Sequence, residues 1–148
     1  MILIAHRGNL NGPCLQKENE PEYLDLALER GFQIEVDIWV INDLIYLGHD
    51  QPTYLIDIEW LKNRVDFLWV HCKNLEAMVF CYQQFAKGFK LNYFWHETDA
   101  VTLTSKGFIW AYPGKQPISG SIAVMPELNN DSIEFCLGIC SDFVSNYY

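Results

Sequence analysis

Short apolar segments recur along the whole chain, and most of them end directly in polar side chains. Most are too short for an ordinary helix, whereas an apolar run of this length is typical of a buried strand. Eight strand candidates follow from this pattern, at residues 1–5, 32–41, 67–70, 91–95, 101–103, 108–111, 122–125 and 137–140. The segment 44–48 is in addition the expected return strand of a hairpin that turns at Asn42-Asp43. The chain is therefore expected to fold around a sheet.

Two helices are expected, and both lie before residue 90. Residues 21–31 begin with a proline and acidic residues and end in Arg30-Gly31, which are the usual start and stop signals of a helix. Residues 75–85 form the second helix, which is closed by Lys87-Gly88. Beyond the second helix, the strand candidates are joined by segments that look like loops.

Eight strand candidates with crossover helices in the first half predict an α/β fold, a reduced (β/α)8 TIM-type barrel whose later helices are missing or replaced by loops. Such barrels typically need about 250 residues, and this chain has 148. The gap between 101–103 and 108–111 is also shorter than the crossover of roughly a dozen residues that parallel neighbours need. An open α/β sheet is the alternative. Without a linker or a repeat, residues 1–148 are expected to form one domain.

Composition excludes several partners. A net charge of -9 is unsuited to nucleic acid or to electrostatic docking on anionic lipid, because both need a basic surface. The five cysteines include no C-x-x-C pair, so reduced thiols are expected rather than structural zinc or a disulfide framework. No apolar stretch reaches transmembrane length, and no signal peptide is recognisable at the amino terminus. We therefore expect a cytoplasmic protein without stable membrane insertion.

Two acidic residues interrupt the most regular strand candidate. Glu35 and Asp37 are two positions apart between Ile34, Val36 and Ile38, so both carboxylates project from one face of the strand. Buried like charges are costly unless a cation neutralises them, and Mg²⁺ or Ca²⁺ prefers carboxylate and water ligands. The alternative is a solvent-facing strand whose acids are merely hydrated.

Two histidines directly follow apolar segments. If the strands before His6 and His49 end on the same side of one sheet, one imidazole can take a proton from a nucleophile while the other gives one to a leaving oxygen. Taken singly, either histidine is more often structural than catalytic. Asp50 can orient His49 or simply cap its loop. Arg7 can bind a phosphate or pair with the carboxylates.

Further polar residues follow the other strand candidates. His71 and Lys73 share one face, so that the lysine can contact a phosphate oxygen or a departing alkoxide, while His71 can ligate the metal or bind substrate. Glu18 and Asn19 in the first loop are expected to brace the site.

These motifs occur in a definite order: Ile4-Ala5-His6-Arg7-Gly8, Glu18-Asn19, Ile34-Glu35-Val36-Asp37 and Gly48-His49-Asp50. In order and spacing they resemble the glycerophosphodiester phosphodiesterase family, within the wider group of phospholipase-C-like phosphodiesterases. Lys73 matches the lysine after that family's third strand, and Gly138–Asp142 looks like its closing strand motif. The resemblance is specific over about the first fifty residues and thin between Lys73 and the last strand.

The resemblance implies a (β/α)8-type barrel that cleaves glycerophosphodiesters, as in lipid metabolism, to glycerol 3-phosphate and an alcohol. The implied roles are an acid–base pair of His6 and His49, metal ligands Glu35 and Asp37, and phosphate contacts from Arg7 and Lys73. The substrate's neighbouring hydroxyl is implied to attack first, which gives a cyclic phosphate that water then opens.

The chain departs from the family at the third metal ligand, because His71 stands where the family usually has an acid two residues before the lysine. We expect Glu35, Asp37 and His71 to bind the metal, with Glu97 or Glu127 as alternative third ligands. Mg²⁺ or Ca²⁺ is the expected ion and Mn²⁺ the alternative, although an imidazole tilts preference toward transition metals over Ca²⁺.

The expected function is that of a metal-dependent phosphodiester hydrolase acting on small glycerophosphodiester-like substrates. A catalytically silent relative that binds a phosphorylated small molecule or partner is an alternative, suggested by the replaced ligand and the short chain. A lipid-directed lyase that releases cyclic phosphates is a third.

Overall fold

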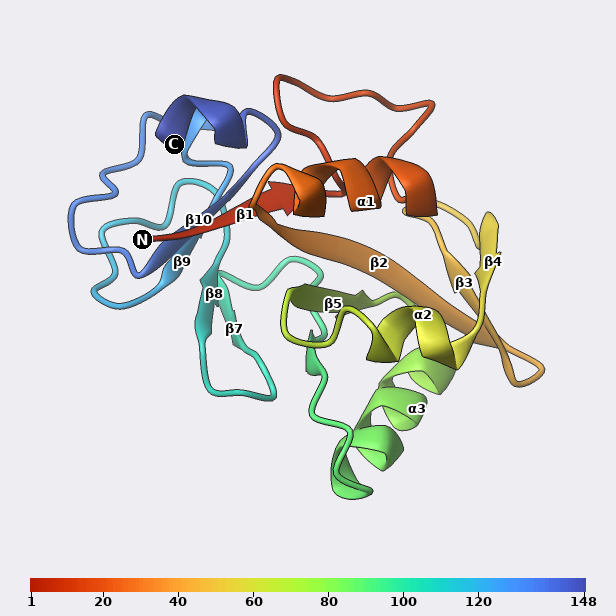
Figure 1. Cartoon of the computed structure of the whole chain (residues 1–148). Helices are drawn as coiled ribbons and strands as arrows, with labels where there is room; N and C mark the ends of the chain where they lie inside the picture. Colours follow the sequence, from red (N-terminus) through yellow and green to blue (C-terminus); the bar gives the residue numbers. More distant parts are fainter.

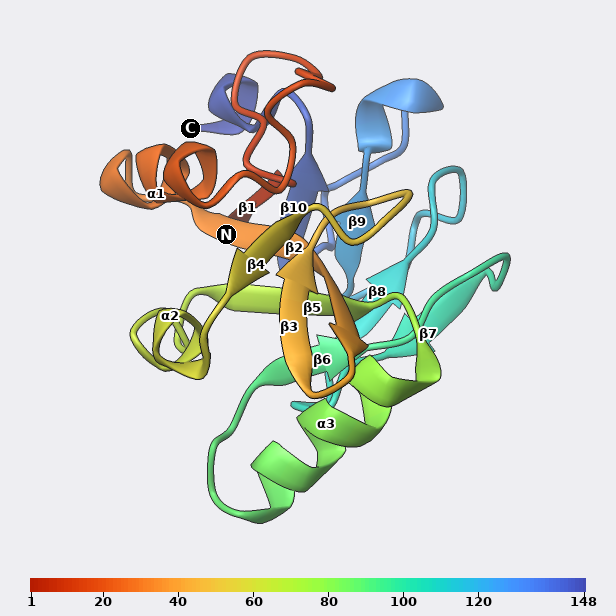
Figure 2. The same ribbon diagram turned by 90° about the vertical axis from the view of Figure 1, so that its right-hand side faces the viewer.

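The apolar segments form one curled sheet in a computed structural model that describes residues 1–148. Its strands are β1 (Ile2–His6), β2 (Gln33–Ile41), β3 (Leu44–Leu47), β4 (Tyr54–Ile56), β5 (Leu68–Cys72), β6 (Asn92–Phe94), β7 (Val101–Leu103), β8 (Ile109–Ala111), β9 (Ile122–Val124) and β10 (Gly138–Ser141). Seven of them are parallel neighbours, in the order β6-β5-β2-β1-β10-β9-β8. Figure 2 shows how far this sheet curls.

Antiparallel strands extend the sheet at both ends. The carboxyl half of β2 pairs with β3, and β3 pairs with β4. The predicted turn at Asn42-Asp43 is confirmed: both residues have positive φ, 50° and 63°, as a tight hairpin turn requires. At the other end, β7 pairs antiparallel with β8.

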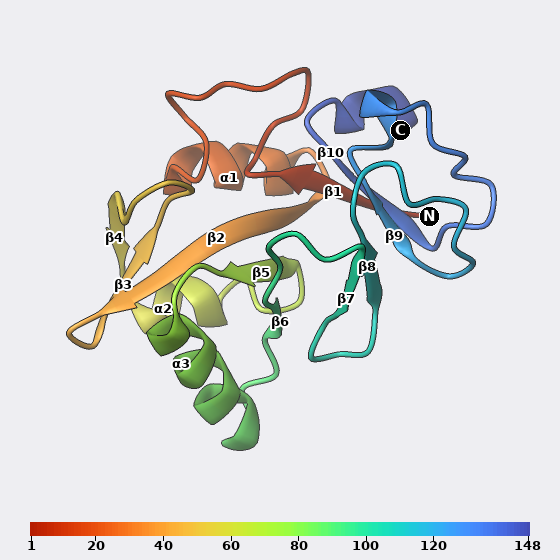
Figure 3. The same ribbon diagram turned by 180° about the vertical axis from the view of Figure 1, so that it is seen from behind.

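Three short helices cover the outer, convex face of the sheet: α1 (Pro21–Glu29), α2 (Ile58–Lys62) and α3 (Leu75–Ala86). Two 3₁₀ turns, η1 (Pro126–Leu128) and η2 (Val144–Tyr147), follow β9 and β10. Figures 1 and 3 show that the helices belong to the red-to-green half of the chain, whereas loops connect the strands of the cyan-to-blue half. The helices at 21–31 and 75–85 were expected, while α2 and β4 were not.

The alternation of side chains along the strands divides the core in two. The outward residues of β2, which are Ile34, Val36 and Ile38, pack with the helices in a cluster of 19 buried residues. A second cluster of 7 buried residues fills the concave side, and its members are Ile4, Trp69, Phe94, Trp110, Ile122, Val124 and Cys140. Polar side chains at the carboxyl ends of the same strands therefore face a small, largely aromatic interior.

The predicted reduced (β/α)8 TIM-type barrel is wrong. The sheet is mixed and curls into a half-barrel, with β6 paired only to β5 and β7 only to β8. The short gap between β7 and β8 permits a hairpin but no crossover helix, so the regular β/α repeat is lost. Ser105, in the β7–β8 hairpin, bonds to the β6 backbone instead: its N–H donates to the Tyr93 carbonyl and its Oγ accepts from the Tyr93 N–H.

All five cysteines are free. No helix of the chain combines the length and the apolar character needed to cross a bilayer.

Candidate metal centre

Strand register brings the polar residues of β1, β2 and β5 together. His6 lies opposite Glu35 in the β1–β2 pair, and Asp37 lies opposite His71 in the β2–β5 pair. Because residues two apart share a face, all four side chains point to the concave side of the sheet. Glu35 is 2% exposed and Asp37 is fully buried, so the alternative of a hydrated surface strand is wrong.

Glu35, Asp37 and His71 form a group that could hold a metal ion, with one ligand atom of each within 4.8 Å of the others. The Nδ1 atom of His71 lies 3.1 Å from Oδ1 of Asp37 and 3.8 Å from Oε1 of Glu35. That Oδ1 atom is buried and accepts no hydrogen bond. Its only cationic neighbour is Nζ of Lys73, at 3.6 Å. A buried oxygen without a hydrogen bond is costly, and a cation bound at the site would offset that cost.

The alternative third ligands lie elsewhere. Glu97 is exposed and makes no ion pair or hydrogen bond through its side chain. Glu127 accepts hydrogen bonds from Ser141 Oγ at 2.8 Å and from the Tyr147 hydroxyl at 3.3 Å, and it is outside the group of potential ligands. His71 is therefore the residue that completes the triad.

Arg7 spans the site from the end of β1. Its NH1 donates to Glu18 at 3.0 Å, its Nε lies 3.2 Å from Oδ2 of Asp37, and its NH2 donates to Nε2 of His49 at 3.2 Å. The backbone of Arg7 has a φ of 52°, an uncommon value for a residue other than glycine, and its N–H donates to Glu35. Arg7 thus pairs with carboxylates, which is the alternative to phosphate binding that the sequence left open.

The first loop folds back onto this centre. Asn19 is fully buried, donates to Oδ2 of Asp37 at 2.9 Å and accepts from the Asp37 N–H at 2.9 Å. Glu18 accepts from Arg7 and also from Asn9. Glu18 and Asn19 therefore both contact charged side chains of the centre, Arg7 and Asp37, as the expected bracing role requires.

His49 reaches the centre from the loop after β3. Its Nδ1 atom is 3.3 Å from Oδ2 of Asp37 and 3.5 Å from Nζ of Lys73, which itself lies 3.6 Å from Oδ1 of Asp37. Trp39, on the same face of β2, donates to the Gly48 carbonyl at 2.7 Å and so fixes the backbone before His49. Asp50 is almost fully exposed, 3.6 Å from Nε2 of His49.

Two residues of the site were missed in the sequence. Asp142 accepts a hydrogen bond of 2.7 Å from Nδ1 of His6, which leaves Nε2 facing Glu35 at 3.9 Å. Asn9 donates to both Asp142 and Glu18. Asp142 directly follows β10 and closes the Gly138–Asp142 segment that the resemblance had marked, and Asn9 lies three residues after the end of β1. These positions were the signals available.

The charged groups perturb one another strongly. Burial, and then the charge of Asp37, raise the pKa of Glu35. Burial alone would raise the pKa of Asp37 too, but the hydrogen bond from His49 and the charge of Arg7 hold it well below its usual range. One acid of the pair is thus stabilised as an anion, and the other is not.

The His6–Asp142 pair is perturbed in a complementary way. Burial lowers the pKa of His6, but the hydrogen bond to Asp142 and the charge of Glu35 outweigh burial and raise it overall. Burial acts to raise the pKa of Asp142, and the bond from His6 brings it below its usual value. The two residues therefore favour an ion pair.

The centre carries an excess of negative charge. Its carboxylates are Glu18, Glu35, Asp37 and Asp142, whereas Arg7 and Lys73 are its permanent cations. With all four acids ionised, four anions and two cations leave an excess of two negative charges when the histidines are neutral, and of one when His6 carries the proton of its ion pair with Asp142. A divalent cation would offset this excess.

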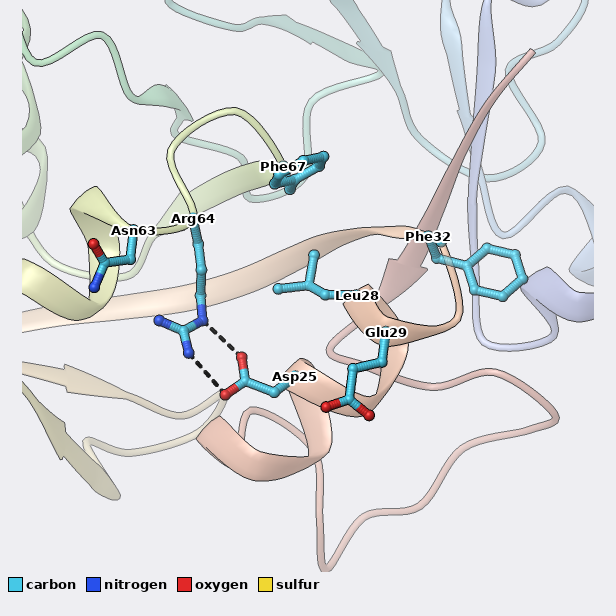
Figure 4. A pocket seen from close by; sticks show the side chains of 8 residues that line it. Asp25, Leu28, Glu29, Phe32, Asn63, Arg64 and Phe67 are labelled. Carbon is cyan, nitrogen blue, oxygen red and sulfur yellow. Dashed lines mark hydrogen bonds and ion pairs between the residues drawn. The ribbon is translucent and has the colours of Figure 1, made fainter.

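A separate hollow of about 460 Å³ lies at the amino ends of β2 and β5, away from the centre. Figure 4 shows that Arg64, the one cation lining it, is already engaged in a bidentate pair with Asp25 at 2.6 and 2.8 Å. Arg64 also stacks on Trp60, 4.4 Å from the ring centroid. The hollow therefore offers no free cation for an anionic ligand, so the candidate metal centre is the better candidate for function.

Comparisons of the chain with protein-family models, with curated proteins and with solved structures give no match.

Proposed function

We propose that the protein is a metal-dependent phosphodiesterase that acts on small glycerophosphodiester-like substrates. One observation carries this proposal: nitrogen atoms of four basic residues surround the buried carboxylate of Asp37, all within 3.6 Å of it. They belong to Arg7, His49, His71 and Lys73. A metal ligand, a proton carrier and two phosphate-binding cations thus share a single anchor, as phosphoryl chemistry requires.

Glu35, Asp37 and His71 are the residues that would hold the ion. When bound, a divalent cation polarises a phosphoryl oxygen and offsets the charge that develops in the transition state. Arg7 and Lys73 supply the remaining positive charge. The guanidinium group of Arg7 suits two phosphate oxygens, and the ammonium group of Lys73 suits one.

The surroundings of the two histidines suggest different roles. Asp142 holds the Nδ1–H of His6, so that Nε2 faces the centre and can take a proton from an attacking hydroxyl. His49 lies beside the guanidinium of Arg7, the group that would bind the phosphate, and is placed to give a proton to the leaving oxygen.

The proposed reaction proceeds in two displacements at phosphorus. A hydroxyl of the glycerol part loses its proton to His6 and forms a new P–O bond, while the bond to the other alcohol breaks and that oxygen is protonated by His49. Water then opens the cyclic phosphate, with the histidines exchanging roles. The products are a glycerol phosphate and a free alcohol.

The experiment measures turnover of glycerophosphocholine and bis-p-nitrophenyl phosphate with Mg²⁺, Mn²⁺ or Ca²⁺. We expect turnover by the wild type and a loss of about 10²- to 10⁴-fold in His6→Ala and His49→Ala. Glu97→Gln, which changes an exposed acid outside the site, is the matched control and should retain wild-type turnover. Circular dichroism establishes that each variant is folded.

A folded wild type that hydrolyses neither substrate with any of these ions contradicts the proposal. If calorimetry then detects binding of glycerol phosphate, the chain is a silent phosphate-binding relative. Phosphorus NMR of the product separates hydrolysis from a lyase reaction, because only the lyase accumulates the cyclic phosphate.

A further inference from the structure

We propose that the centre takes a first-row transition-metal ion of the Mn²⁺ to Zn²⁺ series, in preference to Mg²⁺ or Ca²⁺, through Nδ1 of His71. This inference rests on the metal centre of the proposed function and is independent of whether the chain hydrolyses phosphodiesters. It takes up the tilt toward transition metals that an imidazole at position 71 indicated in the sequence, in place of Mg²⁺ or Ca²⁺ as the first expected ion.

The hydrogen-bond partner of His71 determines which ring nitrogen carries the proton. The Nε2 atom of this ring lies 2.9 Å from the backbone carbonyl oxygen of His96. A carbonyl oxygen only accepts hydrogen bonds, so Nε2 must carry a proton. In the neutral ring, Nδ1 is then an unprotonated nitrogen with a free lone pair, which is the form that ligates a metal.

The lone pair of Nδ1 faces two carboxylate oxygens. The nearest polar atoms are Oδ1 of Asp37 at 3.1 Å and Oε1 of Glu35 at 3.8 Å, and both are acceptors. When Nδ1 is unprotonated and both acids are ionised, these three electron-rich atoms repel one another, and a cation bound among them would relieve the repulsion. Adjacent ligands of an ion that binds at about 2.1 Å are about 3 Å apart, close to the separation of Nδ1 and Oδ1.

The His71 ring is held in this orientation by its neighbours. The His71 ring stacks on Phe94 with the two centroids 5.2 Å apart and the planes at 11°. Phe94 is buried in the concave core and pairs with His71 in the β5–β6 register. The stack on Phe94 fixes the plane of the ring, and a flip within that plane would lose the bond from Nε2 to the His96 carbonyl. That bond also makes Nδ1 a better donor to a metal.

The donor set then decides between classes of ion. Mg²⁺ and Ca²⁺ prefer ligand sets made entirely of oxygen, whereas imidazole nitrogen suits transition metals. The affinity of a given site for these metals rises from Mn²⁺ through Fe²⁺ and Co²⁺ to the ions that directly precede Zn²⁺ in the series. Glu35 and Asp37 supply oxygen, and His71 supplies nitrogen at the third corner. An acid at position 71 would have given an all-oxygen triad.

The direct test is nitrogen-15 NMR of the histidine rings of the wild-type chain, with and without Zn²⁺. We expect Nδ1 of His71 to shift on metal binding while Nε2 keeps its proton. A shift of Nε2, or no change at His71 when Zn²⁺ binds, overturns the inference. This readout needs neither a variant nor a substrate.

A second test compares dissociation constants for Mn²⁺ and Mg²⁺, measured by electron paramagnetic resonance of free Mn²⁺ and by competition. The wild type should bind Mn²⁺ at least about tenfold more tightly, and His71→Glu should reduce this preference by about tenfold or more. Glu97→Gln is the matched control and should keep the wild-type ratio. Equal affinities in the wild type, or the same ratio in a folded His71→Glu, contradict the inference.

Selective Mn²⁺ binding without turnover leaves this inference standing and removes the proposed function. Turnover with Mg²⁺ by a chain that shows no Mn²⁺ preference removes this inference and leaves the proposed function standing. The two proposals therefore fail by different results.

Discussion

At the scale of single residues, the two acids of β2 have opposite relations to the fold. Asp37 is surrounded by nitrogen atoms that stabilise its charge, whereas Glu35 faces burial and the neighbouring charge of Asp37. A carboxyl whose pKa is lowered in the native state stabilises the fold at neutral pH, and one whose pKa is raised destabilises it there. The fold therefore gains stability from Asp37 and loses it from Glu35.

Isosteric amide substitutions should separate these effects. In metal-free protein, Asp37→Asn should lower the free energy of unfolding by about 3 to 5 kcal/mol, because it leaves buried cationic groups without their partner. Glu35→Gln should cause little loss or even a gain, while both variants lose metal affinity. Urea unfolding with EDTA provides the measurement. Equal destabilisation by the two substitutions contradicts this description of the site.

The His6–Asp142 pair makes a prediction about pH. The raised pKa of His6 means that its contribution is fully present below about pH 6.5 and is lost as pH rises through the raised value. The lowered pKa of Asp142 means that its contribution is present above about pH 4 and is lost as pH falls through the lowered value. The ion pair should therefore stabilise the metal-free fold most between these limits.

Asp142→Asn tests this window. The difference in unfolding free energy from the wild type should be about 1 to 3 kcal/mol near pH 5.5 and should shrink in alkaline solution. Proton NMR should also show a lower pKa for His6 in the variant. A stability difference that does not vary with pH, together with an unchanged pKa of His6, would count against the pair.

At the scale of elements, the hairpin after β2 positions His49 through a glycine. Gly48 has a φ of 148°, and a Cβ placed there would lie 2.1 Å from the carbonyl oxygen of Gln51. Gly88 has a φ of 98° but no atom within 4 Å of the same position. The two glycines thus share backbone strain and differ in the space around them.

Gly48→Ala should therefore destabilise the protein clearly more than Gly88→Ala, which should cost about 1 kcal/mol from strain alone. Gly48→Ala should also displace His49 from Asp37 and reduce turnover. Thermal unfolding and the phosphodiesterase assay measure the two effects. Similar losses in both variants would show that the crowding at Gly48 is relieved without cost.

Helix α3 is tied to the sheet by its first capping residue. Asn74 accepts from the N–H groups of Ala77 and Val40 and donates to the Val40 carbonyl at 2.8 Å, so it caps the helix and bonds to β2 at once. Asp57 caps α2 through one exposed bond to the Trp60 N–H. The pair offers a comparison between a cap that also joins elements and a cap alone.

Asn74→Ala should cost about 2 to 4 kcal/mol, because it leaves two buried-side backbone groups of β2 without partners in addition to the lost cap. Asp57→Ala should cost about 1 kcal/mol. Chemical denaturation of both variants under one condition gives the comparison. A cost for Asn74→Ala no larger than that for Asp57→Ala contradicts a joining role.

At the scale of the whole molecule, the sequence predicts strands and the main helices well because hydrophobic period and helix signals are local. The alternation of Glu35 and Asp37 between apolar residues marks the site for the same reason. The architecture is not local: the hairpin of β7 and β8 and the half-barrel depend on which distant strands pair. The sequence therefore predicts a barrel with a regular β/α repeat, whereas the structure has a mixed half-barrel that ends in a hairpin.

The site shows the same limit. Asp142 and Asn9 join His6 and Glu18 only because β10 lies beside β1, a pairing that no spacing in the sequence reveals. The partner of Nε2 in His71 is a backbone carbonyl, which carries no side-chain signal at all. The group that could hold a metal ion was thus predictable from residue types, whereas the hydrogen-bond partner of the His71 ring was not.

The most direct measurement is a crystal structure of the chain grown with Mn²⁺ and glycerol phosphate, with anomalous diffraction data that locate the ion. We predict one anomalous peak, from an ion bonded to Glu35, Asp37 and Nδ1 of His71, with the phosphate contacting Arg7 and Lys73. An ion bound elsewhere, or a centre that stays empty at millimolar Mn²⁺ in an otherwise unchanged fold, would contradict it.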